Sequence, residues 1–153
     1  MNALENKIPP PIITVLFAFV MWCISLFTPA LEVNVTAREI ISLVILLLGV
    51  FFCIAGIVSF RAAKTTINPL KPEEATSLVS NGIYKITRNP MYVGFVLGLI
   101  AWSVYLSSPI TFSGVILFIW YITRFQIIPE ERALREIFSP EYSNYQEKVR
   151  RWL

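Results

Sequence analysis

Long runs without a charged residue constrain this chain more than any other feature. Residues 12–31 and 40–60 contain no Asp, Glu, Lys or Arg, and a third uncharged run extends from residue 91 to 123. About 20 apolar residues suffice for a helix to cross the hydrocarbon core of a bilayer. A soluble domain of 153 residues with 56% hydrophobic residues has too small a core to bury three such runs. The sequence therefore predicts a single-domain, all-α membrane protein.

The third uncharged run is too long for one helix, and Ser107-Ser108-Pro109 provides a turn within it. We therefore expect four transmembrane helices, of which the last two form a tight hairpin. Gly94 and Gly98 form a pair of small residues four positions apart, which would let the third helix pack closely against a neighbour. The expected spans are about residues 12–31, 40–60, 91–107 and 110–128.

The basic residues predict the orientation in the membrane. With four spans, both termini and the loop between the second and third spans share one side. That side holds every Lys and Arg except Arg38. Cytoplasmic segments carry the excess of basic residues, so we expect a multi-pass protein with both termini in the cytoplasm.

Two polar segments lie on this side, at residues 64–94 and 129–152. We expect Pro129 to lie beyond the end of the fourth helix. In the tail, Ser139 and Pro140 are typical of a helix N-cap and first helical position. On the predicted amphipathic helix after them, Tyr142, Tyr145, Val149 and Trp152 share a face, so this helix is expected at the membrane interface or docked on the protein.

The residues that could carry chemistry are few. The chain has no His, and its two Cys lie inside apolar runs, so neither a metal site nor a histidine base is expected. Taken singly, the polar residues also have structural interpretations. Arg88 could anchor the membrane edge, and Asn89 could cap a helix beginning at Pro90. Their concentration where the spans end nevertheless makes them candidates for a site.

Two separated blocks together resemble a known superfamily. The first contains Gly82-x-Tyr84 and Arg88-Asn89-Pro90-x-Tyr92-x-Gly94, and the second contains Glu130-Glu131-x-x-Leu134 followed by Phe138, Tyr142 and Tyr145. Their order and spacing closely resemble the isoprenylcysteine carboxyl methyltransferase and phospholipid methyltransferase superfamily. The resemblance covers roughly residues 64–152, whereas the first two spans match only as hydrophobic helices.

The resemblance implies dependence on S-adenosyl-L-methionine, with the cytoplasmic loop and the C-terminal helix forming its pocket. Carried over by position, it indicates a set of cofactor-binding residues: Leu78, Val79, Tyr84, Asn89, Pro90, Met91, Tyr92 and Glu130. It also implies that Arg88 and Glu131 shape and close the pocket, so Arg88, Glu130 and Glu131 are the catalytic candidates.

The sequence departs from the family pattern at two positions. Asn89 stands where many members have His, and an amide cannot titrate. Gln126 stands where the prenylcysteine enzymes have an Arg that faces the substrate carboxylate. Arg124 is near, but a shift of two helical residues turns a side chain by roughly 200°. Gln126 and Arg124 are the substrate-binding candidates.

The predicted function is methyl transfer from S-adenosyl-L-methionine to a lipid-like or small hydrophobic acceptor. A carboxylate, an amine and a thiol all remain open as the accepting group. The expected partners are the lipid bilayer and this acceptor, without nucleic acid or metal. The alternative is a non-catalytic membrane protein that retains the fold, such as an assembly factor or a transporter subunit.

Overall fold

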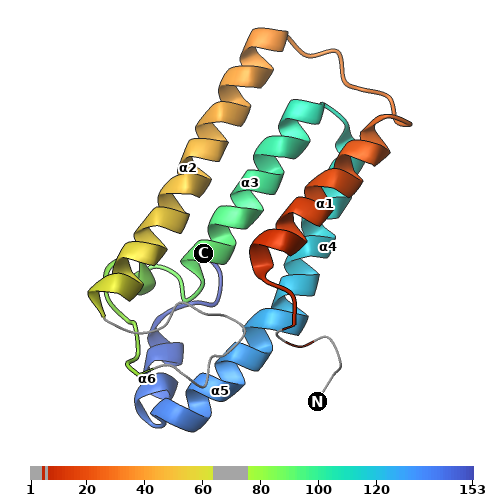
Figure 1. Cartoon of the computed structure of the whole chain (residues 1–153). Helices are drawn as coiled ribbons and strands as arrows, with labels where there is room; N and C mark the ends of the chain where they lie inside the picture. The colour runs from red at the N-terminus through yellow and green to blue at the C-terminus, as the bar shows by residue number, and fades with distance from the viewer. Residues whose placement is uncertain (1–4, 6, 64–75) are drawn as a thin grey trace.

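The computed structural model describes residues 5, 7–63 and 76–153. Every regular element within these ranges is a helix, which confirms the all-α prediction for the described part of the chain. Figure 1 shows the helices in chain order. They are α1 (Pro10–Ser25), α2 (Val35–Ala62), the 3₁₀ turn η2 (Gly82–Lys85), α3 (Pro90–Leu106), the 3₁₀ turn η3 (Pro109–Thr111), α4 (Phe112–Ile122), the π-helical turn η4 (Thr123–Ile127), α5 (Ile128–Phe138) and α6 (Glu141–Lys148).

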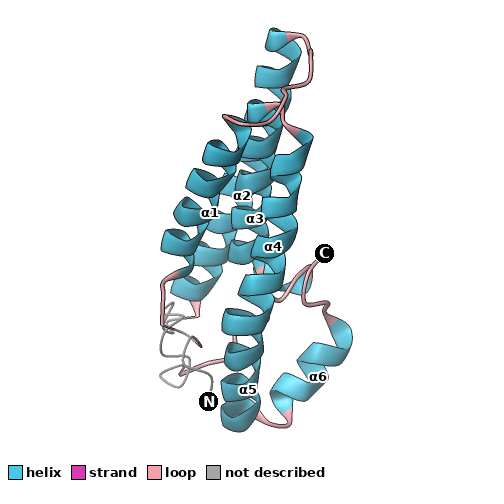
Figure 2. Cartoon of the chain, turned by 90° about the vertical axis from the view of Figure 1, so that its right-hand side faces the viewer, coloured by secondary structure: helices cyan, strands magenta, loops and turns pink. Residues whose placement is uncertain are grey.

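The central helix of the bundle is α3. It packs against α2 on one side and against α1 and α4 on the other (Figure 1). The main core cluster, which includes Ile13, Tyr92, Leu99 and Phe118, joins α1, α3 and α4. Figure 2 shows α5 and α6 beyond the end of the bundle, on the side where the N-terminal segment lies. The described part of the first polar segment, residues 76–94, and the second polar segment therefore meet at one end of the molecule.

Glycines set the close approach of α2 and α3. A Cβ on Gly49 would lie 2.8 Å from the carbonyl oxygen of Gly94, and a Cβ on Gly94 would collide with the Sγ of Cys53. A Cβ on Gly98 would meet nothing within 4 Å. Only the first glycine of the predicted pair is therefore required at the helix contact, and its partner is Gly49 on the facing helix.

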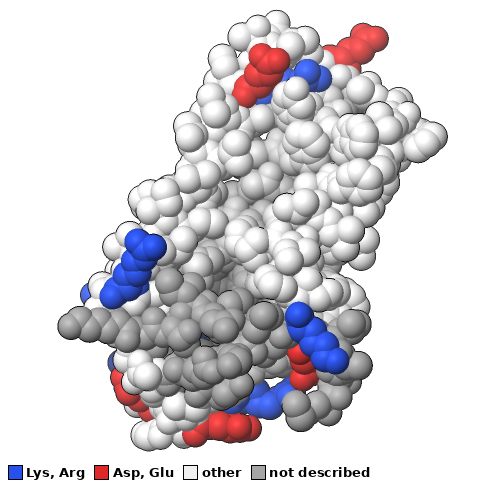
Figure 3. Space-filling view, viewed as in Figure 1, with Lys and Arg blue, Asp and Glu red and all other residues white. Residues whose placement is uncertain are grey.

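Two continuous helical segments, Val35–Ala62 and Pro109–Phe138, are long and apolar enough to cross a membrane. The shorter apolar helices α1 and α3 have 16 and 17 residues. Figure 3 shows Lys, Arg, Asp and Glu toward the two ends of one face, with uncharged side chains across its middle. This distribution and the apolar helices are those of a membrane protein.

Several helix ends differ from the prediction. The first helix ends at Ser25 rather than near residue 31, and Pro29 follows at a position where a helix would need another backbone N–H. The second begins at Val35 rather than 40, because the side chain of Asn34 accepts a hydrogen bond from the N–H of Ala37 (3.0 Å) and caps it.

The prediction that Pro129 lies beyond the fourth helix is wrong. The helix continues through Pro129 to Phe138. A proline ring normally clashes with the carbonyl four residues earlier, which here belongs to Phe125. Phe125 lies inside the π-helical turn Thr123–Ile127, whose wider hydrogen-bonding pattern removes this conflict.

The predicted start of the tail helix is also wrong by one position. Pro140 occupies the N-cap position of α6, and Ser139, joined to it by a cis peptide bond, makes no capping hydrogen bond. Tyr142 and Tyr145 are buried as expected, so the helix docks on the protein. Val149 and Trp152 lie beyond the end of α6, and Trp152 packs against the main core cluster instead.

Candidate functional site

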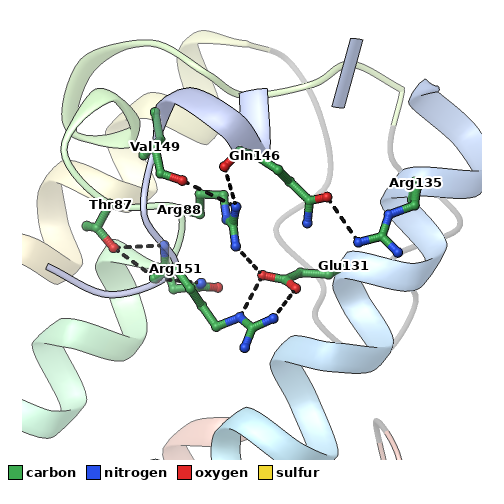
Figure 4. A network of polar contacts seen from close by, with 8 residues as sticks. Thr87, Arg88, Glu131, Arg135, Gln146, Val149 and Arg151 are labelled. Carbon is green, nitrogen blue, oxygen red and sulfur yellow. Dashed lines mark hydrogen bonds and ion pairs between the residues drawn. The ribbon is translucent and has the colours of Figure 1, made fainter. Parts of the chain in front are cut away.

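The carboxylate of Glu131 is the centre of a buried ionic network (Figure 4). Its Oε1 accepts hydrogen bonds from Nη2 of Arg88 (2.9 Å) and Nε of Arg151 (2.9 Å), and its Oε2 accepts one from Nη2 of Arg151 (2.7 Å). Arg151 binds both oxygens in a fork geometry that favours strong, directional bonds, and Arg88 adds a third bond to the same carboxylate. The network joins α5 to the segment before α3 and to the C-terminal residues.

Arg88 and its neighbours also hold the C-terminal segment through its backbone. Nη1 of Arg88 donates to the carbonyl oxygens of Gln146 (3.1 Å) and Val149 (3.2 Å). The amide of Asn89 donates to the carbonyl oxygen of Arg151 (2.9 Å) and does not cap α3, although that helix begins at Pro90 as expected. Arg88 and Asn89 therefore bind the tail of the chain in this structure.

The tail helix packs on the 78–85 segment. Val79, Tyr84, Tyr142 and Tyr145 form a second buried cluster, with Leu78 against it. The hydroxyl of Tyr145 donates to the carbonyl oxygen of Tyr84 (2.6 Å), and burial raises the pKa of Tyr145, so the phenol remains a neutral donor. These contacts bring together the two predicted halves of the site.

Glu130 points away from the ionic network. Its Oε1 accepts a short hydrogen bond (2.5 Å) from the hydroxyl of Tyr92 on α3. Burial raises the pKa of the Glu130 carboxyl to about 8, against a smaller opposing effect of the Tyr92 hydrogen bond. Some of the residue's surface remains accessible, and its charge also contributes to the raised pKa of Tyr84. Tyr84, Tyr92 and Glu130 therefore form one group around a carboxyl with no ion pair among the described residues.

Pro90 and Met91 lie on a different face of α3. A Cβ added to Gly56 of α2 would meet Cγ of Met91 at 2.7 Å and Cγ of Pro90 at 3.5 Å. These two predicted cofactor residues therefore contact α2.

Gln126 and Arg124 contact the N-terminal segment. Gln126 is fully buried, and its Nε2 donates to the carbonyl oxygen of Ile8 (2.9 Å). Its Oε1 is buried without a hydrogen-bond partner among the described residues. Arg124 pairs with Glu5 (3.3 Å), and Arg132 reaches the other oxygen of the same carboxylate (3.5 Å).

An open cavity of about 520 Å³ lies between the 78–85 segment and α6. Its size is within the range of small-ligand pockets. Of the residues predicted to bind the cofactor, it includes Leu78 alone. Its lining is mixed, with the polar side chains of Ser80, Asn81, Lys85, Glu141, Asn144 and Lys148 beside Leu78, Tyr145 and Val149.

Sequence reasoning missed three participants: Arg151, Thr87 and Glu5. Thr87 is fully buried, and its hydroxyl donates to the carbonyl oxygen of Arg151 (3.2 Å) and accepts from the N–H of Asn89 (3.2 Å). For Arg151 and Glu5, the sequence signal was the concentration of charged residues near both ends of the chain. It does not specify which cation pairs with which carboxylate.

Comparison with known proteins identifies the family to which this chain belongs. The sequence model of the phospholipid methyltransferase family matches residues 37–141 of the chain. The match runs from near the start of α2 to the first residue of α6, so it covers the polar segment 64–94 and the beginning of the segment 129–152. This chain belongs to the phospholipid methyltransferase family, and the predicted resemblance is confirmed.

Relatives whose names state a function support the same superfamily. The chain is 28% identical over 109 residues to a probable protein-S-isoprenylcysteine O-methyltransferase of Oryza sativa subsp. indica, covering 71% of this chain and 57% of the relative. It is 35% identical over 79 residues to the protein-S-isoprenylcysteine O-methyltransferase of Saccharomyces cerevisiae, covering 52% of this chain and 33% of the relative. An uncharacterized Haemophilus influenzae protein is 46% identical over 63 residues, covering 41% of this chain and all of that protein.

The chain thus spans little more than half the length of the plant relative and a third of the yeast one. No solved structure matches the chain.

Proposed function

We propose that this protein is an S-adenosyl-L-methionine-dependent methyltransferase embedded in the membrane. Its acceptor is a lipid-like or small hydrophobic molecule. The observation that carries the proposal is the hydrogen bond between Tyr92 and Glu130, which joins the two motif blocks of the chain at one carboxyl. Family membership supports methyl transfer as the reaction.

The chemistry of the group around Glu130 fits the cofactor. S-adenosyl-L-methionine carries an ammonium, a sulfonium and ribose hydroxyls, all of which are attracted to or donate to a carboxylate. Glu130 provides a carboxyl that no arginine neutralises among the described residues, and Tyr84 and Tyr92 provide aromatic surface beside it. In this proposal Leu78 and Val79 contribute apolar surface, whereas Arg88 and Glu131 hold the tail helix in place.

The cofactor supplies a methyl group already activated on a cationic sulfur. The protein therefore has to position the acceptor in line with that group and exclude water. The docked tail and the end of the helical bundle enclose the region of Glu130, and the apolar helices allow a hydrophobic acceptor to enter from the bilayer.

We further propose the four-span arrangement, with α1, α2, α3 and the α4 segment crossing the bilayer. The spanning part of the last helix would end near residue 128, and the polar residues from Glu130 onward would extend into the cytoplasm. The two shorter helices fit this arrangement if the bilayer thins locally or flanking residues extend to the interface.

Binding of S-adenosylhomocysteine to the detergent-purified protein tests the function. A ligand at a hundredfold excess over its Kd stabilises the folded state by about 2.7 kcal/mol, which a thermal-unfolding assay detects. Glu130→Ala should abolish this stabilisation while the variant stays inserted and folded, and the matched control Glu136→Ala, at an exposed position of the same helix, should retain it. No shift for the wild-type protein at millimolar ligand would favour a non-catalytic member that retains the fold.

A further inference from the structure

A second ionic cluster lies beside the N-terminal segment. Arg124 of the π-helical turn and Arg132 of α5 both pair with the carboxylate of Glu5, at 3.3 and 3.5 Å. Two positive charges against one negative charge leave this cluster with a formal charge of +1. A local excess of one sign of charge attracts ligands of the opposite sign, so the cluster favours an anion.

The two arginines of this cluster are accessible to a further ligand. Their distances to Glu5 are longer than the 2.7 to 2.9 Å of the bonds around Glu131. Their side chains are 40% and 53% exposed, whereas that of Arg88 is 11% exposed. Of the five N–H donors of its guanidinium, Arg124 uses one among the described residues. The remaining donors of a planar guanidinium match the oxygens of a phosphate group.

The cluster lies at the level expected for lipid head groups. In the proposed four-span arrangement the last span ends near residue 128. Arg124 and Arg132 then lie about 6 Å before and about 6 Å beyond that end along the helix axis. The polar layer on each side of the hydrocarbon core is about 5–7 Å thick. The two guanidinium groups therefore lie on either side of the start of this layer.

An exposed apolar stripe leads along α4 to Arg124. It consists of Phe112, Ile116 and Trp120, which recur at every fourth residue before Arg124 and so lie along one side of the helix. The ring of Trp120 packs edge-on against Phe125, with the centroids 5.9 Å apart, and the guanidinium of Arg124 lies 5.6 Å from the centroid of Phe125. An acyl chain on this stripe would place its head group beside Arg124.

We propose that Arg124 and Arg132 bind the phosphate of an anionic phospholipid, whose acyl chain lies along the exposed stripe of α4. The proposal rests on the four-span arrangement and goes beyond the methyltransferase function, because this lipid is a bound structural ligand and not the methyl acceptor. Glu130 faces Tyr92 of α3, whereas the two arginines are exposed beside Glu5. The lipid phosphate therefore lies outside the candidate site.

The charge of the cluster selects the class of lipid. The phosphate of phosphatidylcholine is accompanied by a choline cation, which a positive cluster repels. The head group of phosphatidylglycerol carries no charge besides its phosphate. One positive charge near the membrane surface should favour the anionic lipid about fivefold.

Quenching of tryptophan fluorescence by brominated lipids tests the proposal, with Trp120 as the reporter on the stripe. The full chain is reconstituted in dioleoylphosphatidylcholine, and dibrominated phosphatidylglycerol or dibrominated phosphatidylcholine is added at constant ionic strength. We expect phosphatidylglycerol to be preferred about fivefold, and Trp120→Phe to remove this preference from the remaining fluorescence. Equal quenching by both lipids would overturn the proposal. Loss of the preference in millimolar inorganic phosphate would also overturn it, because the site would then bind a free anion.

Substitutions connect the preference to the cluster. Arg124→Gln and Arg132→Gln should each lower it about fivefold. The matched control Arg135→Gln should retain it, because Arg135 is an exposed arginine of α5 without an ion pair among the described residues. Glu5→Gln removes the competing carboxylate and should raise the preference about fivefold, a gain that misfolding does not produce.

An equal loss in Arg135→Gln would overturn the proposal, because the preference would then follow the total charge of the surface. No gain in Glu5→Gln would overturn it as well. If neither lipid quenched Trp120, the four-span arrangement would fail together with the lipid site. The measurement contains no cofactor, so its result is independent of whether S-adenosylhomocysteine binds.

Discussion

Replacing Glu131 with Gln should destabilise the protein strongly, although the change alters only one atom and one charge. In the native structure both carboxylate oxygens are used by two guanidinium groups, at 2.7 to 2.9 Å. The neutral amide keeps one acceptor and turns a donor toward an arginine. Arg88, whose side chain is 11% exposed, would then hold a buried charge without a counter-charge.

The expected magnitude follows from that uncompensated charge. Breaking a buried ion pair by removing one partner costs about 3–5 kcal/mol. For a chain of this size, each kcal/mol lowers Tm by roughly 2–4 °C, so Glu131→Gln should lower Tm by about 6–20 °C. The C-terminal residues should also become accessible, because Arg88 and Arg151 join them to α5.

Thermal unfolding of the detergent-purified variants measures the first effect, and carboxypeptidase digestion measures the second. Glu136→Gln is the matched control, because Glu136 is an exposed residue of α5 without an ion pair among the described residues. Arg151→Gln in the Glu131→Gln background should cost less than Arg151→Gln alone, since the pair is already broken. A Tm for Glu131→Gln within 2 °C of that for Glu136→Gln would refute the reasoning (roughly the effect of a surface substitution).

Two further predictions concern α3 and Glu130. Gly94→Ala should lower Tm clearly, because its Cβ would collide with Cys53 on α2, whereas Gly98→Ala should be tolerated; equal Tm values for the two variants would contradict the helix contact. The pKa of Glu130 rises from 4.5 to about 8 on folding, so the native state binds a proton that the unfolded state releases, and stability falls as pH rises from about 5 to 8. Glu130→Gln should therefore gain in Tm relative to the wild type as pH rises through this window, and a Tm difference that is constant from pH 5 to 8 would show that Glu130 is not buried in this way.

The sequence predicted the features that depend on local pattern. The uncharged runs predicted the helices, and Ser107 and Pro109 predicted the break between α3 and α4. The continuation of the last helix through Pro129 could not be predicted, because it depends on a π-helical turn that no residue pattern marks. The end of α1 is a different case, because Pro29 marks it in the sequence, whereas the uncharged run on which the expected span was based continues to residue 31.

The sequence also did not predict which groups the charged side chains contact. Arg88, Asn89 and Glu131 were predicted as site residues from the family resemblance, and the structure brings them to one end of the bundle. Their contacts are nevertheless with the C-terminal segment, through Arg151 and through backbone carbonyl groups. Such contacts depend on how a tail of the chain folds back, which spacing within a motif does not encode.

The two adjacent glutamates, Glu130 and Glu131, lie in two different physical environments. Consecutive residues of a helix point about 100° apart, so Glu130 and Glu131 cannot share a partner. Glu131 faces Arg88 and Arg151 and links α5 to the segment before α3 and to the C-terminal residues. Glu130 faces Tyr92, has no ion pair among the described residues, and burial raises its pKa to about 8. Exchanging the two environments would require rotating the helix. The rigid attachment of α5 through Glu131 is therefore what keeps the titratable carboxyl of Glu130 directed at the proposed site.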